Sequence, residues 1–96
     1  MKKAIWNKRV IAESDQTIEL EGNVYFPLGS IEPQYFELSP KETKSPWLGA
    51  ANYYHLTIDG KRLENVAWYY PNPKLEGRHI RNFVAFAEPI EVIENS

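Results

Sequence analysis

Apolar and polar residues alternate over short segments of the chain, and turn-forming residues separate these segments. Over residues 17–21 the alternation has a period of two, which is typical of a β-strand with one buried face. No segment keeps a helical period over several turns. The pattern therefore predicts an all-β fold of about eight to ten short strands, at residues 4–6, 9–11, 17–21, 24–26, 35–38, 52–58, 61–70, 80–86 and 90–93.

Short connections predict that these strands pair antiparallel. Asn7-Lys8, Gly22-Asn23 and Asp59-Gly60 carry residues that form tight hairpin turns. Longer loops with prolines are expected at residues 39–46 and 71–77, and helical structure in at most one short helix. The length suits a single domain over residues 1–96, curled into an open barrel or a two-layer β arrangement.

Aromatic residues are concentrated in the middle of the chain, where ten of the 13 lie between Tyr25 and Tyr70. A two-residue turn at Asp59-Gly60 predicts the cross-strand pairs Ala51–Trp68, Tyr53–Val66 and His55–Glu64. Because cross-strand partners share a face, one face of this hairpin is predicted to carry Tyr53, Trp68 and Tyr70, and the other Tyr54, Leu56 and Tyr69. One face is expected to form core, which leaves the other free for a site.

Composition narrows the classes of function. The 11 Lys and Arg residues against 13 Asp and Glu residues give a net charge of −2, so no nucleic-acid partner is expected. The absence of cysteine removes thiol chemistry, and two His residues without neighbouring carboxylates predict no metal site and no cofactor. The longest apolar run, residues 83–87, is too short to span a membrane, and no signal peptide follows Lys2-Lys3, so a cytoplasmic location is expected.

Candidate functional residues lie on and beside the aromatic hairpin. The ligand-binding candidates are Trp47, Gly49, Tyr53, His55, Trp68 and Tyr70. For Trp47 the alternative is a core side chain at the entry to a strand. His55 and Glu21 are candidate general bases. Their alternatives are a cross-strand charge pair for His55 and a solvated strand face for Glu21.

Four stretches together resemble a known family. They are Trp6-Asn7 to Ile11-Ala12-Glu13-Ser14, Glu21-Gly22-Asn23-Val24-Tyr25-Phe26-Pro27, Ser45-Pro46-Trp47-Leu48-Gly49-Ala50-Ala51-Asn52-Tyr53-Tyr54, and Ala67-Trp68-Tyr69-Tyr70-Pro71-Asn72-Pro73, followed by Val84-Ala85-Phe86. Over nearly the whole chain, their order and spacing resemble the bacterial domain-of-unknown-function family numbered 427, also labelled nucleotidyltransferase-like. The resemblance implies a compact β fold, similar in topology to methionine sulfoxide reductase B domains but without their cysteine chemistry.

The chain departs from the family pattern in one loop. Relatives often have Cys-Pro-Trp/Tyr-Lys-Gly where this chain has Ser45-Pro46-Trp47-Leu48-Gly49. Ser45 cannot act as a thiolate and Leu48 brings no cation, so Ser45 is a candidate only for a weak nucleophile or a hydrogen-bond donor. Nucleotidyl transfer also needs carboxylates that hold Mg²⁺, usually with a Gly-rich phosphate loop, and the sequence offers neither.

Three functional hypotheses follow, in order of preference. The first is the binding of a small molecule in an aromatic-lined pocket. The second is a homodimer that buries the aromatic surface, since exposed apolar patches mark interfaces. The third is a weak hydrolase or transferase that uses His55 or Glu21 as its base.

Overall fold

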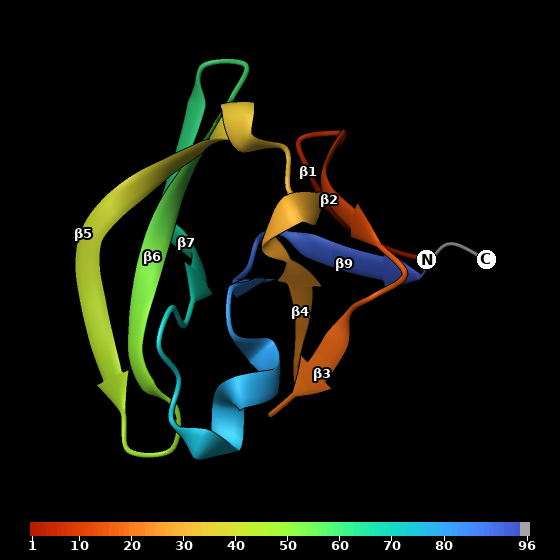
Figure 1. Cartoon of the computed structure of the whole chain (residues 1–96). Coiled ribbons are helices and arrows are strands. Elements are labelled where there is room, and N and C mark those ends of the chain that lie inside the picture. The colour runs from red at the N-terminus through yellow and green to blue at the C-terminus, as the bar shows by residue number, and fades with distance from the viewer. Residues whose placement is uncertain (95–96) are drawn as a thin grey trace.

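The computed structural model describes residues 1–94, which form two antiparallel sheets (Figure 1). The three-stranded sheet has the order β2-β1-β9, and the six-stranded sheet has the order β3-β4-β8-β7-β6-β5. The strands are β1 (Lys2–Trp6), β2 (Arg9–Ser14), β3 (Ile18–Leu20), β4 (Asn23–Pro27), β5 (Phe36–Ser45), β6 (Gly49–Ile58), β7 (Lys61–Tyr69), β8 (Phe83–Phe86) and β9 (Glu91–Glu94). Short 3₁₀ segments are η1 (Leu28–Ser30), η2 (Pro33–Tyr35) and η3 (Leu75–Ile80). The predicted all-β fold is confirmed, and no closed barrel forms within residues 1–94.

Two-residue turns explain why neighbouring strands form hairpins. Both central residues have positive φ, with values of 51° and 64° at Asn7-Lys8, 53° and 81° at Glu21-Gly22, and 52° and 78° at Asp59-Gly60. These values belong to type I′ turns, whose twist matches that of the paired strands. Two of the predicted turns are confirmed. The turn predicted at Gly22-Asn23 lies one residue earlier, because Asn23 already pairs across the β3–β4 hairpin.

β5 is longer than the sequence pattern predicts. In place of the loop expected at residues 39–46, the strand continues to Ser45, with one irregularity between Leu38 and Glu42. β5 lies at the edge of the six-stranded sheet, where Pro40 needs no ladder partner on its open side. The strand expected at residues 80–86 is shorter than predicted, because η3 continues to residue 80 and β8 begins only at Phe83.

The hairpin of β6 and β7 has its predicted turn, but its predicted register is wrong beyond the first few pairs. Next to the turn, Leu56 pairs with Leu63 as predicted, whereas beyond a bulge Tyr53 pairs with Trp68 rather than with Val66. The shift amounts to two residues, and side chains alternate with a period of two. Tyr53 and Trp68 therefore share a face, as predicted, although they were not predicted to be partners.

The bulge in β7 is held by His55 and Asn65. Asn65 has a φ of 55°, and its backbone N–H donates a hydrogen bond to Nδ1 of His55 at 3.0 Å. The irregularity in β5 lies at nearly the same level of the sheet, and the Ser39 hydroxyl donates a hydrogen bond to Oδ1 of Asn65. Bulges bend strands and increase their twist. The two bulges on either side of β6 are thus joined at one point where the sheet curves.

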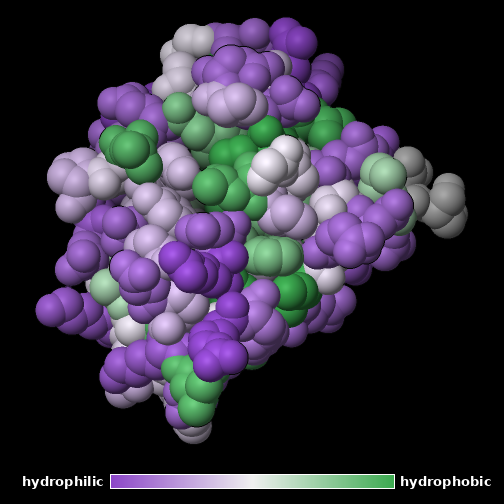
Figure 2. All heavy atoms as spheres, in the orientation of Figure 1, coloured by the Kyte–Doolittle hydropathy of each residue, from purple (hydrophilic) through white to green (hydrophobic). Residues whose placement is uncertain are grey.

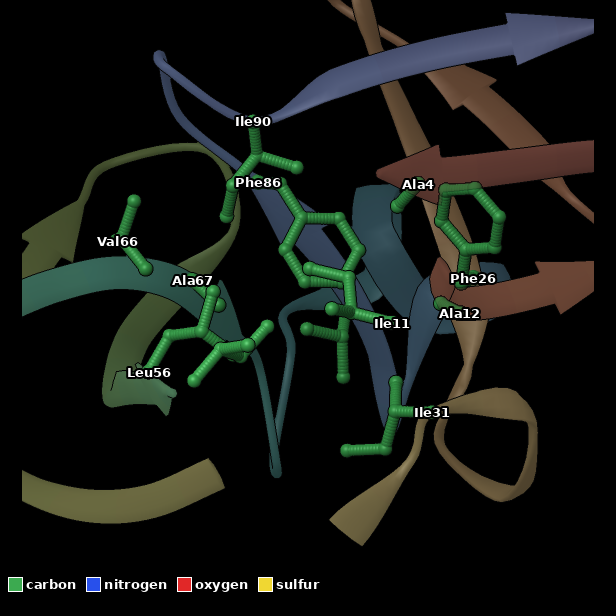
Figure 3. Close-up of a cluster of buried hydrophobic side chains, with 12 residues drawn as sticks. Ala4, Ile11, Ala12, Phe26, Ile31, Leu56, Val66, Ala67, Phe86 and Ile90 are labelled. Carbon is green, nitrogen blue, oxygen red and sulfur yellow. The ribbon is translucent and has the colours of Figure 1, made fainter. Parts of the chain in front are cut away.

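A first hydrophobic core fills the space between the two sheets (Figure 3). Its buried members are Ala4, Ile11 and Ala12 of the three-stranded sheet, Phe26, Leu56, Ile58, Val66, Ala67, Val84 and Phe86 of the six-stranded sheet, and Ile31 and Ile90 of the connections. The rings of Phe26 and Phe86 meet edge to face, with their centroids 5.7 Å apart. This core holds the two layers together.

A second core covers the opposite face of the six-stranded sheet. Its buried members are Tyr25, Leu48, Ala51, Tyr70, Ile80 and Ala85, and the partly buried rings of Tyr53 and Trp68 pack against them. Because both faces of the central hairpin pack against other residues, the expectation that one face stays free for a site is wrong. Tyr53 and Trp68 nevertheless stay partly exposed at the margin of this core.

Candidate functional site

The turn between β5 and β6 directs the side chain of Trp47 outward and that of Leu48 inward. The Ser45 hydroxyl oxygen accepts hydrogen bonds from the backbone N–H groups of Trp47 and Leu48, each at 3.2 Å. Trp47 is 59% exposed, whereas Leu48 is 3% exposed and belongs to the second core. The alternative prediction of a core Trp at this position is therefore wrong, because the adjacent leucine takes the buried place.

Gly49 and Gly77 allow this turn to lie close to η3. Gly49 has a φ of 99°, and a Cβ there would lie 3.4 Å from the carbonyl oxygen of Asn72. Gly77 is buried, and a Cβ there would lie 2.8 Å from Cδ2 of Leu48. Lys74 joins the two segments, since its backbone N–H donates to the Leu48 carbonyl at 2.9 Å. Gly49, predicted to approach a ligand, thus serves the packing of the turn.

A third segment, the β3–β4 turn, meets the other two at the lower end of the molecule in Figure 1. Between them lies an open cleft of about 230 Å³, lined by Leu20, Glu21, Trp47, Leu48 and Glu76, which we call the Trp47 cleft. Leu20 and Leu48 also pack in the second core, so they form an apolar floor. Glu21 and Glu76 are exposed carboxylates. In the same view, Figure 2 shows an isolated hydrophobic group at this end, surrounded by hydrophilic residues.

The aromatic residues of the second core lie next to this floor. The indole N–H of Trp68 donates to the Tyr25 hydroxyl at 3.2 Å, and the rings of Tyr53 and Trp68 are tilted, with centroids 6.5 Å apart. The Tyr53 hydroxyl is 3.0 Å from Oγ1 of Thr43, and the Lys41 ammonium lies 5.0 Å from the Tyr53 ring centroid. The predicted residues Tyr53, Trp68 and Tyr70 are thus brought together, as the packed layer beneath the cleft.

Burial governs the tyrosines of this layer. It raises the pKa of Tyr70 to about 12, with smaller contributions from Tyr25, Tyr53 and Glu21. The pKa of Tyr25 is also raised by burial, against an opposing hydrogen bond from Trp68. Among the described residues every fully buried side-chain nitrogen or oxygen has a hydrogen-bond partner, and the Tyr70 hydroxyl makes no such bond. That hydroxyl must therefore reach solvent, as a neutral group at physiological pH.

We expect Tyr70→Phe to remove part of the loss of stability at alkaline pH. The folded pKa of Tyr70, about 12, lies above its ordinary value of 10.0. The stability that the neutral phenol contributes is therefore present below pH 10.0 and is lost as the pH rises toward 12. Because the hydroxyl reaches solvent, we discount the effect to about 1–2 kcal/mol.

Urea unfolding of both proteins at a series of pH values between about 9 and about 12 measures this difference. The other titrating groups are common to the two proteins and cancel in the comparison. Stability that declines in parallel in the wild type and in Tyr70→Phe would contradict the assignment.

His55 lies away from the cleft. It is 8% exposed, sits beside the bulge and faces Glu37 on β5. The predicted pairing of His55 with Glu64 is wrong, because the bulge displaces Glu64, whose carboxylate instead lies 3.6 Å from Nε of Arg62. The one hydrogen bond that the His55 side chain makes among the described residues is the one it accepts from the Asn65 backbone. Its position is that of a structural residue.

The three candidate catalytic residues do not converge. Ser45 pairs with Gly49 at the start of β6, and His55 lies six residues further along that strand. At about 3.3 Å per residue this is a separation of roughly 20 Å. Glu21 and Ser45 both lie at the cleft end of the molecule, but in different segments, the β3–β4 turn and the end of β5. Among the described residues, the Ser45 hydroxyl has no hydrogen bond to a histidine or a carboxylate.

Sequence reasoning missed three lining residues, namely Leu20, Leu48 and Glu76. Two of them could have been found from the sequence. Leu20 is an apolar residue just before a tight turn, and Leu48 is an apolar residue in a loop. Glu76 could not, because only the fold brings η3 to this place.

A second open cleft, of about 370 Å³, lies on the side of the first core. Its lining residues are Leu28, Gly29, Ile31, Pro33, Phe36 and Tyr54. None of them is charged, so the cleft offers a ligand no ion-pair partner.

The fold and this end of the molecule define a class: a small all-β domain of two antiparallel sheets, with a cleft at the end of an aromatic layer. The family model described as "Domain of unknown function (DUF427)" and labelled NTP_transf_9 matches residues 2–95. The chain therefore belongs to the DUF427 family, which confirms the family resemblance. No curated protein matches the chain.

Two further observations concern residues 1–94. In this part of the chain, no three His, Cys, Asp or Glu side chains gather so that they could hold a metal ion. The same residues contain no helix with the length and apolar character that crossing a bilayer requires.

Proposed function

We propose that the protein binds a small molecule in the Trp47 cleft. The observation that carries the proposal is the exposure of Trp47, whose side chain is 59% accessible at the edge of an opening of about 230 Å³. An indole contributes most binding free energy when its apolar surface is buried, and none of residues 1–94 covers the indole of Trp47 fully. A ligand seated on Leu20 and Leu48 would cover that surface.

The surroundings of Trp47 support a preformed site. Its loop is held by two hydrogen bonds to the Ser45 hydroxyl oxygen and by the hydrogen bond from Lys74 to Leu48. The Lys74 ammonium also donates to the Pro46 carbonyl oxygen at 3.0 Å. A site that is already ordered before binding loses less entropy when the ligand arrives.

A fragment screen monitored by NMR tests the proposal through the indole N–H signal of Trp47. We expect hits that shift this signal, and Trp47→Ala should weaken their binding about tenfold or more, since a buried aromatic contact is worth over 1 kcal/mol. The matched control is Leu38→Ala, which removes a side chain that is 65% exposed on β5. Hits that bind Trp47→Ala as tightly as the wild type would refute the cleft as the site.

The alternative, a homodimer through the same end, is favoured by one observation. Leu75 of η3 is 73% exposed and follows Lys74, which contacts the Trp47 loop. If this end self-associates, light scattering should show a dimer that Leu75→Ser returns to the monomer. We expect instead a monomer at all concentrations, with the end free for a ligand.

A further inference from the structure

We propose that the ligand of the Trp47 cleft is an organic cation, with an ammonium or guanidinium group carried on a small apolar body. This inference rests on the binding function proposed above and adds the chemical class of the ligand. It is drawn from the charge of the lining residues, from the pairing of carboxylates elsewhere in the molecule and from the exposed indole.

The charged residues that line the cleft are of one sign. Glu21 and Glu76 supply carboxylates from two different segments, and the remaining lining residues are apolar or aromatic. Lys74 lies next to the loop of Trp47, but its ammonium donates to the carbonyl oxygen of Pro46 at 3.0 Å, and no Lys or Arg of residues 1–94 lines the cleft. The cleft therefore offers negative charge beside apolar surface.

These two carboxylates differ from those surface carboxylates that have a cation as a partner. At the opposite end of the molecule, Glu37 lies 2.8 Å from an Arg62 nitrogen, and Asp59 lies 3.3 Å from an Arg9 nitrogen. Within residues 1–94, neither Glu21 nor Glu76 forms an ion pair or a hydrogen bond through its side chain. Glu42, Glu88 and Glu91 are likewise unpaired within these residues, but they do not line this cleft. A ligand in the cleft could therefore meet the charge of two lining carboxylates that have no cation of their own in this part of the chain.

The exposed indole favours the same kind of ligand. Trp is the aromatic residue with the strongest attraction for a cation over its face. An anion would be repelled by the carboxylates and by the negative face of the ring, and a neutral molecule would use only the apolar floor. A cleft of about 230 Å³ lies below the roughly 300–1,000 Å³ of sites for drug-sized ligands, so the body of the cation must be small.

Three probes of similar shape and different charge test the inference. They are benzyltrimethylammonium, the uncharged dimethyl benzyl carbinol, and the anion phenylmethanesulfonate, each titrated against the full chain and monitored by the indole and amide signals. We expect the cation to bind about threefold to tenfold more tightly than the carbinol, and the sulfonate to bind most weakly. The advantage of the cation should shrink with added salt, while the carbinol should be unaffected.

Charge-neutral variants separate the contribution of each carboxylate. Glu21→Gln and Glu76→Gln should each weaken the binding of the cation about twofold to fivefold and leave the carbinol unchanged. Glu91→Gln, which removes an exposed carboxylate from β9, is the matched control for net charge and should change neither affinity. All these side chains are exposed, so the variants should fold.

The outcomes distinguish this inference from the function on which it rests. If the carbinol binds as tightly as the cation and both shift the Trp47 signal, the cation is the wrong class and the binding site stands. Tighter binding of the sulfonate would also overturn the inference. If none of the probes shifts that signal, the inference fails, and if the fragment screen gives no hits either, the proposed function fails with it.

Discussion

Phe26→Ala should lower the free energy of unfolding by about 3–5 kcal/mol, the usual cost of truncating a fully buried aromatic side chain. Phe26 is 0% exposed and packs edge-on against Phe86. Ala4 and Ala12, which face it from the three-stranded sheet, are too small to fill the space that it would leave (Figure 3). The total free energy of unfolding of a small domain is about 5–15 kcal/mol, so the variant should be close to unfolding.

Urea unfolding followed by Trp fluorescence measures this loss. Leu38→Ala is a suitable control, because Leu38 is 65% exposed and its removal should change the stability by about 0.5 kcal/mol or less. Equal losses in the two variants would show that the first core is not where the stability lies.

His55→Ala is expected to cost about 2–4 kcal/mol of stability and to leave ligand binding in the Trp47 cleft intact. The side chain is 8% exposed, so its truncation leaves a void. It also removes the acceptor of the Asn65 N–H, and a buried N–H without a partner loses its hydration without compensation.

His55→Asn provides the matched comparison, since its side-chain oxygen can replace Nδ1 as the acceptor. We expect it to lose less stability than His55→Ala, and to keep more of the protection of the Asn65 amide against hydrogen exchange. If both variants keep wild-type stability while ligand binding or turnover disappears, His55 is a functional residue and its structural assignment is wrong.

The local features of this fold could be predicted from the sequence. Alternating apolar positions locate the strands, and turns such as Asp59-Gly60 locate the hairpins, because both depend on residues that are neighbours in the chain. The face shared by Tyr53 and Trp68 was predicted for the same reason. It survives the error in the register because the bulge shifts the pairing by two residues.

The bulge itself could not be predicted, because it depends on a contact between two strands. Asn65 adopts a positive φ where its N–H meets Nδ1 of His55, and no periodic pattern of apolar residues encodes that meeting. The length of β5 could not be predicted either, because a proline such as Pro40 normally ends a strand. The strand continues through Pro40 because β5 lies at the edge of the sheet.

The candidate site was predictable only in part. Trp47 and Glu21 were chosen separately from their local sequence, one as a ligand contact and one as a base. Their shared cleft is created when the β3–β4 turn, the β5–β6 turn and η3 meet, and Glu76 enters only by that route. His55 was chosen for its chemistry, but its position depends on the bulge and lies far from the cleft.

The paired bulges beside β6 also limit how this hairpin can change in length during evolution or in engineering. Adding or removing two residues near Asn65 would alter the bend but keep Trp68 and Tyr69 on their present sides of the sheet. Adding or removing one residue would exchange the two, placing each ring in the core that the other now occupies. Length variants of this hairpin should therefore be tolerated in even steps and rejected in odd ones.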